Sequence, residues 1–274
     1  MLLASLPVVM GFSWLERLFA PDAQLLDERW QVSDDANEGV ISHAAWDSFL
    51  KTHIRRDANG INRLPYDAVT PQARAQVKSY VQQMQAVMVS TFSSGEQLSY
   101  WINLYNAVTV DVVLDHYPID SIRDINFGNR FANGPWSEKL VKVEGVDLSL
   151  NDIEHGIIRP VFNEPRIHYA VNCAAAGCPN LQAQAFTAAN LETMLTTAAR
   201  EFVNNPRGVT ITRDGKLIAS SIYNWFAADF GGTEAAVIDH LRKHSNASLA
   251  IALADRTSID DYAYDWTLND YRGV

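Results

Sequence analysis

The sequence lacks the motifs that mark several large enzyme classes. It has no Gly-rich phosphate loop, no G-x-S-x-G elbow and no H-E-x-x-H helix, which excludes nucleotide kinases, typical serine esterases and zincins from the leading interpretations. It also has no low-complexity tract, no internal repeat and no linker long enough to separate domains. We therefore predict one domain over residues 21–274, preceded by a separate apolar segment at residues 1–20.

Basic charge is scarce as well. The 274 residues include 22 Lys and Arg against 32 Asp and Glu, which gives a formal net charge of -10 spread along the chain. No cluster of Lys and Arg follows a helix face, so the sequence offers no positive surface for a phosphate backbone or an anionic membrane. We expect no nucleic-acid partner.

Long hydrophobic runs are also missing. The N-terminal run MLLASLPVVMGF is too short to cross a bilayer, which takes about 20 residues, so we expect no membrane-spanning segment. Its length and small residues are typical of the apolar region of a signal peptide, although no basic residue precedes it. We expect an exported, periplasmic protein; the alternative is an ordinary apolar segment that leads into Trp14 and Leu15.

The hydrophobic pattern predicts helices on both sides of a small antiparallel sheet, which is an α+β fold with a helical lobe packed against that sheet. Ser42 as an N-cap, the Thr70-Pro71 pair and Asn151 as an N-cap predict three helix starts. Glu144-Gly145 and Asp214-Gly215 predict hairpin turns. The expected helices span residues 42–56, 71–88, 94–117, 150–159, 187–204, 221–230 and 233–244; the expected strands are hairpins at 139–150 and 210–220, a buried strand at 166–172 and an edge strand at 259–266.

Both cysteines lie in one stretch, RIHYAVNCAAAGCPNL, five positions apart. His168 precedes Cys173 by five residues, and small residues separate Cys173 from Cys178, so a substrate can approach both sulfur atoms. A thiol nucleophile needs a neighbouring base or a helix N-terminus to favour its thiolate. We choose Cys173 as the nucleophile and His168 as the base.

Cys178 is the competing nucleophile or a disulfide partner, because Pro179 after it predicts the first turn of a short helix. An equally consistent interpretation has both cysteines as buried apolar side chains or as a structural bridge. A zinc site built from His155, His168, Cys173 and Cys178 has the wrong order and spacing for a zinc finger. We therefore predict no metal and no cofactor.

The segment IEHGIIRP supplies the acid. Glu154 and His155 are neighbours on a predicted helix and diverge by about 100°, so both cannot aim at one site with equal ease. We choose Glu154 to orient His168; the alternative is a salt bridge within the helix from Glu154 to Arg159. Asn103 and Asn106, on an apolar helix, are either the orienting group or hydrogen-bonding struts of the core.

Five segments in order resemble the signature of the family called domain of unknown function 547. They are YWINLYNA (100–107), IEHGIIRP (153–160), RIHYAVNCAAAGCPNL (166–181), SIYNWFAADF (221–230) and YDWTLN (264–269), so the resemblance covers residues 95–269. It implies a papain-like or transglutaminase-like thiol hydrolase, often exported from bacteria.

From residues and resemblance together we predict a cysteine-dependent hydrolase or acyltransferase that acts on peptide or amide substrates. The alternative is a binding module without catalysis that captures a peptide or a small thiol such as glutathione, with cysteines that only form disulfides. A structural zinc site is the third interpretation.

Overall fold

The structure is a computed structural model that describes residues 21–128 and 133–271 and divides into two compact units. The larger unit holds residues 21–199 together with the chain from Trp266 on, and the smaller unit holds residues 200–265. The apolar segment at residues 1–20 lies outside the described residues. Whether residues 21–274 fold as one domain stays a prediction.

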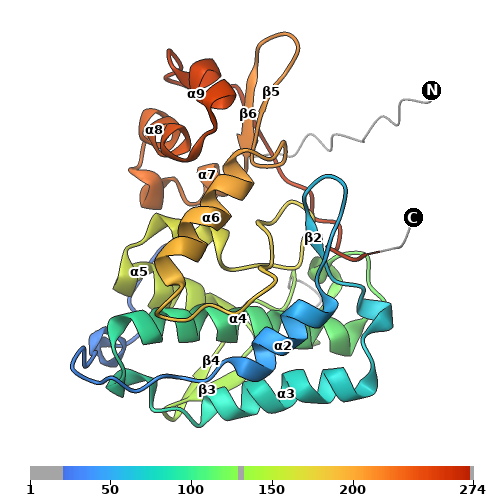
Figure 1. Ribbon diagram of the computed structural model, residues 1–274, viewed down its shortest axis with the longest axis vertical. Helices are drawn as coiled ribbons and strands as arrows, with labels where there is room; N and C mark the ends of the chain where they lie inside the picture. Colours follow the sequence, from blue (N-terminus) through green and yellow to red (C-terminus); the bar gives the residue numbers. More distant parts are fainter. Residues whose placement is uncertain (1–20, 129–132, 272–274) are drawn as a thin grey trace. The chain divides into compact units, whose positions relative to one another are not determined.

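The larger unit is mainly helical (Figure 1). Its longer helices are α2 (Ala44–His53), α3 (Pro71–Gln85), α4 (Ser94–His116), the π-helix η5 (Asp152–Ile158), α5 (Arg159–Phe162) and the first part of α6 (Leu191–Val203). Its short 3-10 helices are η1 (Glu28–Gln31), η2 (Tyr66–Ala68), η3 (Val89–Thr91), η4 (Ile122–Asp124) and η6 (Pro165–Tyr169). Its strands form two antiparallel hairpins, β1 (Arg55–Arg56) with β2 (Asn62–Arg63), and β3 (Val141–Val143) with β4 (Val146–Leu148).

Helix α4 is the centre of the larger unit. Every residue from Glu96 to Val110 is buried, and α4 packs against α3 and η5. A helix that is covered on all sides cannot show one polar face, so its polar side chains need partners inside the protein. The helix ends at His116, with Tyr117 as its C-cap, because Pro118 cannot continue it.

Several local predictions are confirmed. Thr70 accepts a hydrogen bond from the backbone N–H of Ala73, and Pro71 is the first residue of α3. Glu144 and Gly145 both have positive φ in the turn between β3 and β4, as a tight hairpin requires. Two predicted N-caps are wrong, because His43 rather than Ser42 precedes α2 and the Asn151 side chain caps no helix.

The smaller unit contains a three-stranded sheet in the order β5 (Val209–Ile211), β6 (Leu217–Ser220) and β7 (Asp261–Ala263). Strands β5 and β6 are antiparallel, whereas β7 joins β6 in parallel and confirms the predicted edge strand. The helices of this unit are α7 (Ile222–Trp225), η7 (Ala227–Phe230), α8 (Glu234–His244) and α9 (Ala247–Leu253). Helices with small hairpins make the protein α+β, as predicted.

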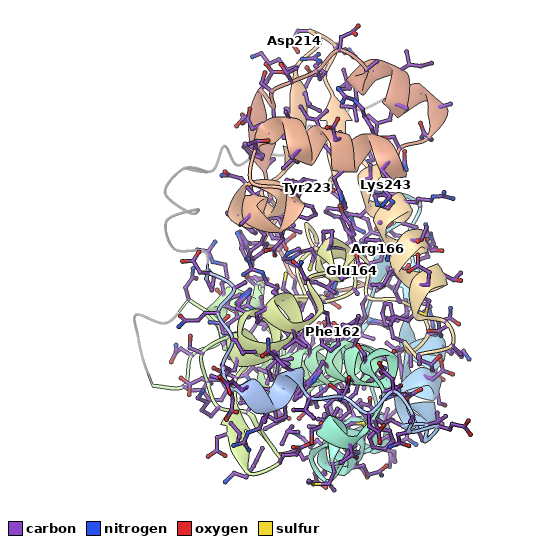
Figure 2. All side chains as sticks on the ribbon, turned by 90° about the vertical axis from the view of Figure 1, so that its left-hand side faces the viewer. Phe162, Glu164, Arg166, Asp214, Tyr223 and Lys243 are labelled. Atoms are coloured by element: carbon purple, nitrogen blue, oxygen red, sulfur yellow. The ribbon has the colours of Figure 1, made fainter. Side chains whose placement is uncertain are left out.

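The predicted strand at residues 166–172 is wrong. Residues Pro165–Tyr169 form η6 instead, because Pro165 fixes the first turn and the Glu164 side chain accepts from the backbone N–H of Arg166. The Arg166 side chain also clasps Glu164 and Glu192, and Figure 2 shows Glu164 beside Arg166. Burial alone would raise the pKa of Glu164, but the hydrogen bonds from Arg166 hold it below its usual value.

Among the described residues, no helix combines the length and the apolar character that crossing a membrane demands.

Buried His43 makes the stability of the fold depend on pH. Its Nδ1 lies 2.7 Å from the Tyr80 hydroxyl, and burial lowers its pKa to about 4 from the ordinary 6.5. Because the unfolded chain takes up a proton at higher pH than the folded one, the stability that neutral His43 contributes is complete above pH 6.5 and is lost as the pH falls toward 4.

We expect His43→Gln to weaken this dependence. Between pH 7 and pH 4, His43 should lower the free energy of unfolding of the parent by about 3 kcal/mol, because one unit of pKa shift corresponds to about 1.4 kcal/mol. Urea unfolding of parent and variant at both pH values measures the difference. Equal losses in the two proteins would exclude His43 as the cause.

Candidate functional site

The cysteine loop, residues 170–181, has a fixed conformation. The Asn172 side chain accepts from the backbone N–H of Ala174 at 2.9 Å and donates to the Pro179 carbonyl at 2.7 Å, which closes the loop on itself. Ala174 has a φ of 57°, a left-handed conformation that is rare for a residue with a Cβ. Such strain persists only where surrounding contacts impose it, and it gathers at functional sites.

Helix α4 holds this loop through one amide. Asn106 donates from Nδ2 to the Ala170 carbonyl at 2.8 Å, and its Oδ1 accepts from the Asn172 backbone N–H at 2.8 Å. Asn103 makes the same pair of bonds, at 2.7 and 3.1 Å, with the backbone of Phe186. Both amides are therefore struts between α4 and a loop, the second of the two roles considered for them.

The two cysteines differ in exposure and in contacts. Cys173 is half-buried, whereas Cys178 is buried. The Cys178 sulfur accepts from the backbone N–H of Cys173 at 3.0 Å and lies 3.9 Å from the Val171 carbonyl. No disulfide joins the pair in the described structure. The short helix expected after Pro179 is wrong, because the chain from 179 to 187 has no helix.

Glu154 lies close to two histidines. Its Oε1 is 3.8 Å from Nδ1 of His168 and 3.9 Å from Nδ1 of His155, and all three side chains are buried. The expectation that Glu154 and His155 diverge is wrong. A π-helix has wider turns than an α-helix, and η5 carries both residues toward the same point. Single π-helical turns occur frequently at functional sites.

Arg159 contacts His155 at one atom. Its Nη1 lies 3.0 Å from Nδ1 of His155 and 2.7 Å from the Pro21 carbonyl. A guanidinium has only donors, so the Nδ1 of His155 must be the acceptor.

Tyr105 is a member of the site that sequence reasoning missed. It is buried on α4, and its side chain hydrogen-bonds Glu154. Burial raises its pKa well above the ordinary value, and the nearby charges of Glu154, Cys173 and Cys178 add to the rise. Tyr105 thus remains a protonated donor to Glu154 and lies within electrostatic range of both sulfur atoms. In the sequence it is one aromatic among many on an apolar helix.

Among residues 21–128 and 133–271, no three His, Cys, Asp or Glu side chains are grouped so that they could hold a metal ion. The four residues considered for zinc, His155, His168, Cys173 and Cys178, lie within these ranges.

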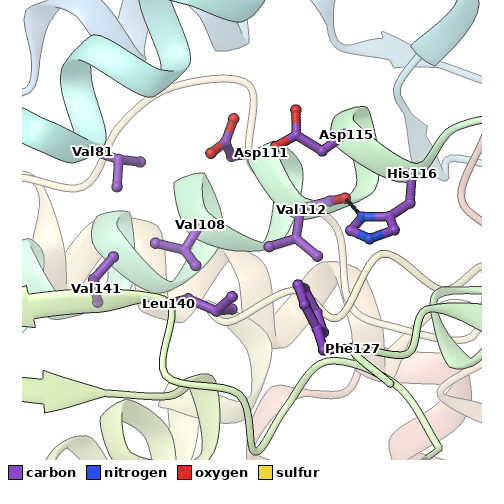
Figure 3. A pocket seen from close by; sticks show the side chains of 9 residues that line it. All are labelled: Val81, Val108, Asp111, Val112, Asp115, His116, Phe127, Leu140 and Val141. Atoms are coloured by element: carbon purple, nitrogen blue, oxygen red, sulfur yellow. Dashed lines mark hydrogen bonds between the residues drawn. The ribbon is translucent and has the colours of Figure 1, made fainter. Parts of the chain in front are cut away.

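A pocket of about 200 Å³ lies elsewhere in the larger unit, at α3, α4 and β3 (Figure 3). Its lining is mainly apolar, with Asp111 and Asp115 at one side, and Nζ of Lys78 lies within 3.1 Å of both carboxylates. It contains none of the candidate residues.

Residues 89–203 match the model of the family described as protein of unknown function, DUF547. The resemblance predicted from the motifs is confirmed. The DUF547 match includes Glu154, His168, both cysteines and Tyr105, while the motifs at 221–230 and 264–269 lie beyond it. No curated protein and no solved structure matches the chain.

Asn106→Ala is expected to free the cysteine loop, because it leaves the Ala170 carbonyl and the Asn172 N–H without the partner that they share. Buried unpaired groups cost about 1–3 kcal/mol each. Asn103→Ala is the matched control, since it removes the same pair of bonds from Phe186. Both variants should unfold at lower urea concentration, but only Asn106→Ala should alter the alkylation rate of Cys173. Equal alkylation rates in the two variants would contradict the role of Asn106.

Proposed function

We propose that the protein is a cysteine-dependent hydrolase or acyltransferase that acts on peptide or amide substrates, as a papain-like or transglutaminase-like enzyme does. Cys173 is the nucleophile, His168 the base and Glu154 the orienting acid. The observation that carries the proposal is the buried contact between Glu154 and His168, joined through Tyr105 to the surroundings of both cysteines.

Glu154 and the proton of the Cys173 thiol are assigned to different ring nitrogens of His168. Nδ1 of His168 lies 3.8 Å from Oε1 of Glu154, and the proposal assigns the thiol proton to Nε2. A carboxylate beside Nδ1 favours the imidazolium that forms when the thiol is deprotonated. The distance exceeds that of a hydrogen bond, and catalytic contacts of this kind tighten when substrate binds.

Two bond exchanges complete the reaction. His168 takes the proton of Cys173, and the thiolate forms a bond to the carbonyl carbon of the amide. The C–N bond then breaks, the leaving amine receives the proton from His168, and the acyl group stays on sulfur as a thioester. Water gives a proton to His168 and attacks the thioester, which releases the acid and restores the thiol. If an amine takes the place of water, the result is acyl transfer.

Exposure and bonding favour Cys173 over Cys178. A nucleophile must reach solvent, and Cys173 is the half-buried cysteine. The buried Cys178 sulfur already accepts the N–H of Cys173, so it supports the loop that carries the nucleophile.

Alkylation by iodoacetamide tests the nucleophile and the base. We expect stoichiometric labelling of the parent near pH 6, no fast labelling in Cys173→Ser, and retained fast labelling in Cys178→Ser. His168→Gln should slow the reaction about a hundredfold, as loss of a positioned base does. His116→Gln is the matched control, because the His116 ring contacts the Val112 carbonyl and Phe127, and neither residue belongs to the candidate site. Intact-mass spectrometry measures each rate.

A peptide mixture incubated with each protein tests turnover, with new termini detected by mass spectrometry. The parent should cleave and Cys173→Ser should not. Slow labelling that is equal in all variants, with no cleavage, would contradict the hydrolase and favour the binding module.

Glu154→Gln keeps the shape of the acid and removes its charge. Less imidazolium then stands beside the thiol, so the pH midpoint of alkylation should rise and the rate near pH 6 should fall about tenfold to a hundredfold. Thermal stability should change little, since an amide of nearly equal size leaves no cavity. Glu144→Gln is the matched control, because the Glu144 carboxylate bonds Ser90 outside the candidate site. A Glu154 variant with the parent's pH profile would make Glu154 a structural residue.

A further inference from the structure

An extended segment, Pro21–Leu26, lies along the helix that carries Glu154. We call it the strap. The backbone N–H of Gln24 donates to the His155 carbonyl at 3.0 Å, and that of Leu26 donates to the Gly156 carbonyl at 2.9 Å. Most of the strap is exposed, and the Leu26 side chain is 42% exposed. Main-chain hydrogen bonds rather than apolar burial therefore hold the strap in place.

The helix η5 offers two backbone carbonyls to which the strap can donate. Pro160 has no N–H, so it cannot donate to the carbonyl of Gly156 four residues earlier or of His155 five residues earlier. These are the two carbonyls that the strap binds. Gly156 permits the close approach, because a Cβ at that position would lie 3.0 Å from the Cβ of Leu26.

Arg159 connects the strap to the acid and histidine cluster. Its Nη1 donates to the Pro21 carbonyl at 2.7 Å and to Nδ1 of His155 at 3.0 Å. Because Arg159 can only donate, Nδ1 of His155 carries no proton, and the proton of the neutral ring is on Nε2. In that form His155 cannot use Nδ1 to pair with Glu154, although the two atoms are only 3.9 Å apart.

We propose that Arg159, anchored on the strap, is a positioning residue that holds His155 in the neutral Nε2–H form and so reserves the Glu154 carboxylate for His168. The inference rests on the proposed function for its catalytic consequence, but the state of His155 is independent of it. His155, His168 and Tyr105 lie close to Glu154, and Arg159 contacts His155, the ring that competes with His168.

The ring nitrogen signals of His155 in ¹⁵N NMR spectra test directly whether Arg159 keeps Nδ1 of His155 unprotonated. The parent should show an unprotonated Nδ1 and a protonated Nε2 at pH 7, with the signals assigned by their loss in His155→Gln. In Arg159→Met, Nδ1 should gain a proton and pair with Glu154. Arg166→Met is the matched control, since Arg166 binds Glu164 and Glu192 rather than the cluster. A protonated Nδ1 in the parent, or unchanged signals in Arg159→Met, would overturn the inference.

The alkylation pH profile of Cys173 tests whether this state of His155 reserves the Glu154 carboxylate for His168. Arg159→Met should slow labelling near pH 6 about tenfold, in the range of other supporting contacts of a site. Adding His155→Gln removes the competing ring and should restore most of the rate. A loss that is caused only by local unfolding would not be restored, and that result would contradict the positioning role. If the labelling rate is also unchanged in His168→Gln, the proposed hydrolase is contradicted. The NMR result still determines the protonation state of His155 in that case.

A second pair of variants tests the strap without touching Arg159. Gly156→Ala places a methyl group 3.0 Å from the Leu26 Cβ, so Leu26 must shift; we expect the strap to loosen and chymotrypsin to cleave faster after Leu25 or Leu26. The same variant should shift the alkylation profile as Arg159→Met does. Gly156→Ala with Leu26→Gly removes the clash and should restore both protection and profile. A lifted strap with an unchanged alkylation profile would show that the strap does not position the site.

Discussion

The burial of α4 is the constraint on which the larger unit depends. A helix covered on all sides must give every polar side chain a partner, because an unpaired buried group costs more than a bonded one contributes. Asn106 bonds the backbone of the cysteine loop, Asn103 bonds the backbone at Phe186, and Tyr105 bonds Glu154. Three polar side chains within about one turn of α4 thus fix two loops and the Glu154 carboxylate. The site is positioned by the same contacts that satisfy the core.

The second constraint comes from Pro160. A proline inside a helix removes one donor and crowds the carbonyl four residues earlier. In η5 the chain accommodates this by widening its turns and by taking hydrogen bonds from the strap. The wider turns bring Glu154 and His155 toward one point, so an irregularity that disrupts the regular helix also gathers the polar side chains of the cluster.

The elements that the sequence predicts well are those decided by neighbours along the chain. Thr70 and Pro71 begin α3, and Glu144-Gly145 makes a hairpin turn, because caps and tight turns depend on a few adjacent residues. The strand predicted at 166–172 is wrong because Arg166 is held by Glu192, 26 residues away, and because the alternating residues Ile167 to Tyr169 are all buried together. The π-helix depends on a strap more than 130 residues distant, since Arg159 and Pro21 are 138 residues apart.

For the site, the residue types that attract attention in a sequence are reactive ones. Glu154, His168 and Cys173 could be chosen on that basis, whereas Tyr105 could not, since only its burial beside Glu154 distinguishes it from other core aromatics.

The cluster also raises a question of chemistry that residue types alone cannot answer, because one carboxylate faces two imidazoles at nearly equal distance. An acid shared equally would stabilise neither imidazolium fully, and the base would lose part of its advantage. The donor-only guanidinium of Arg159 distinguishes the two rings, because it lies 3.0 Å from Nδ1 of His155 and requires that atom to accept. In the proposed mechanism, the charge of Arg159 therefore determines which histidine is able to become cationic, and the strap fixes the position of that charge.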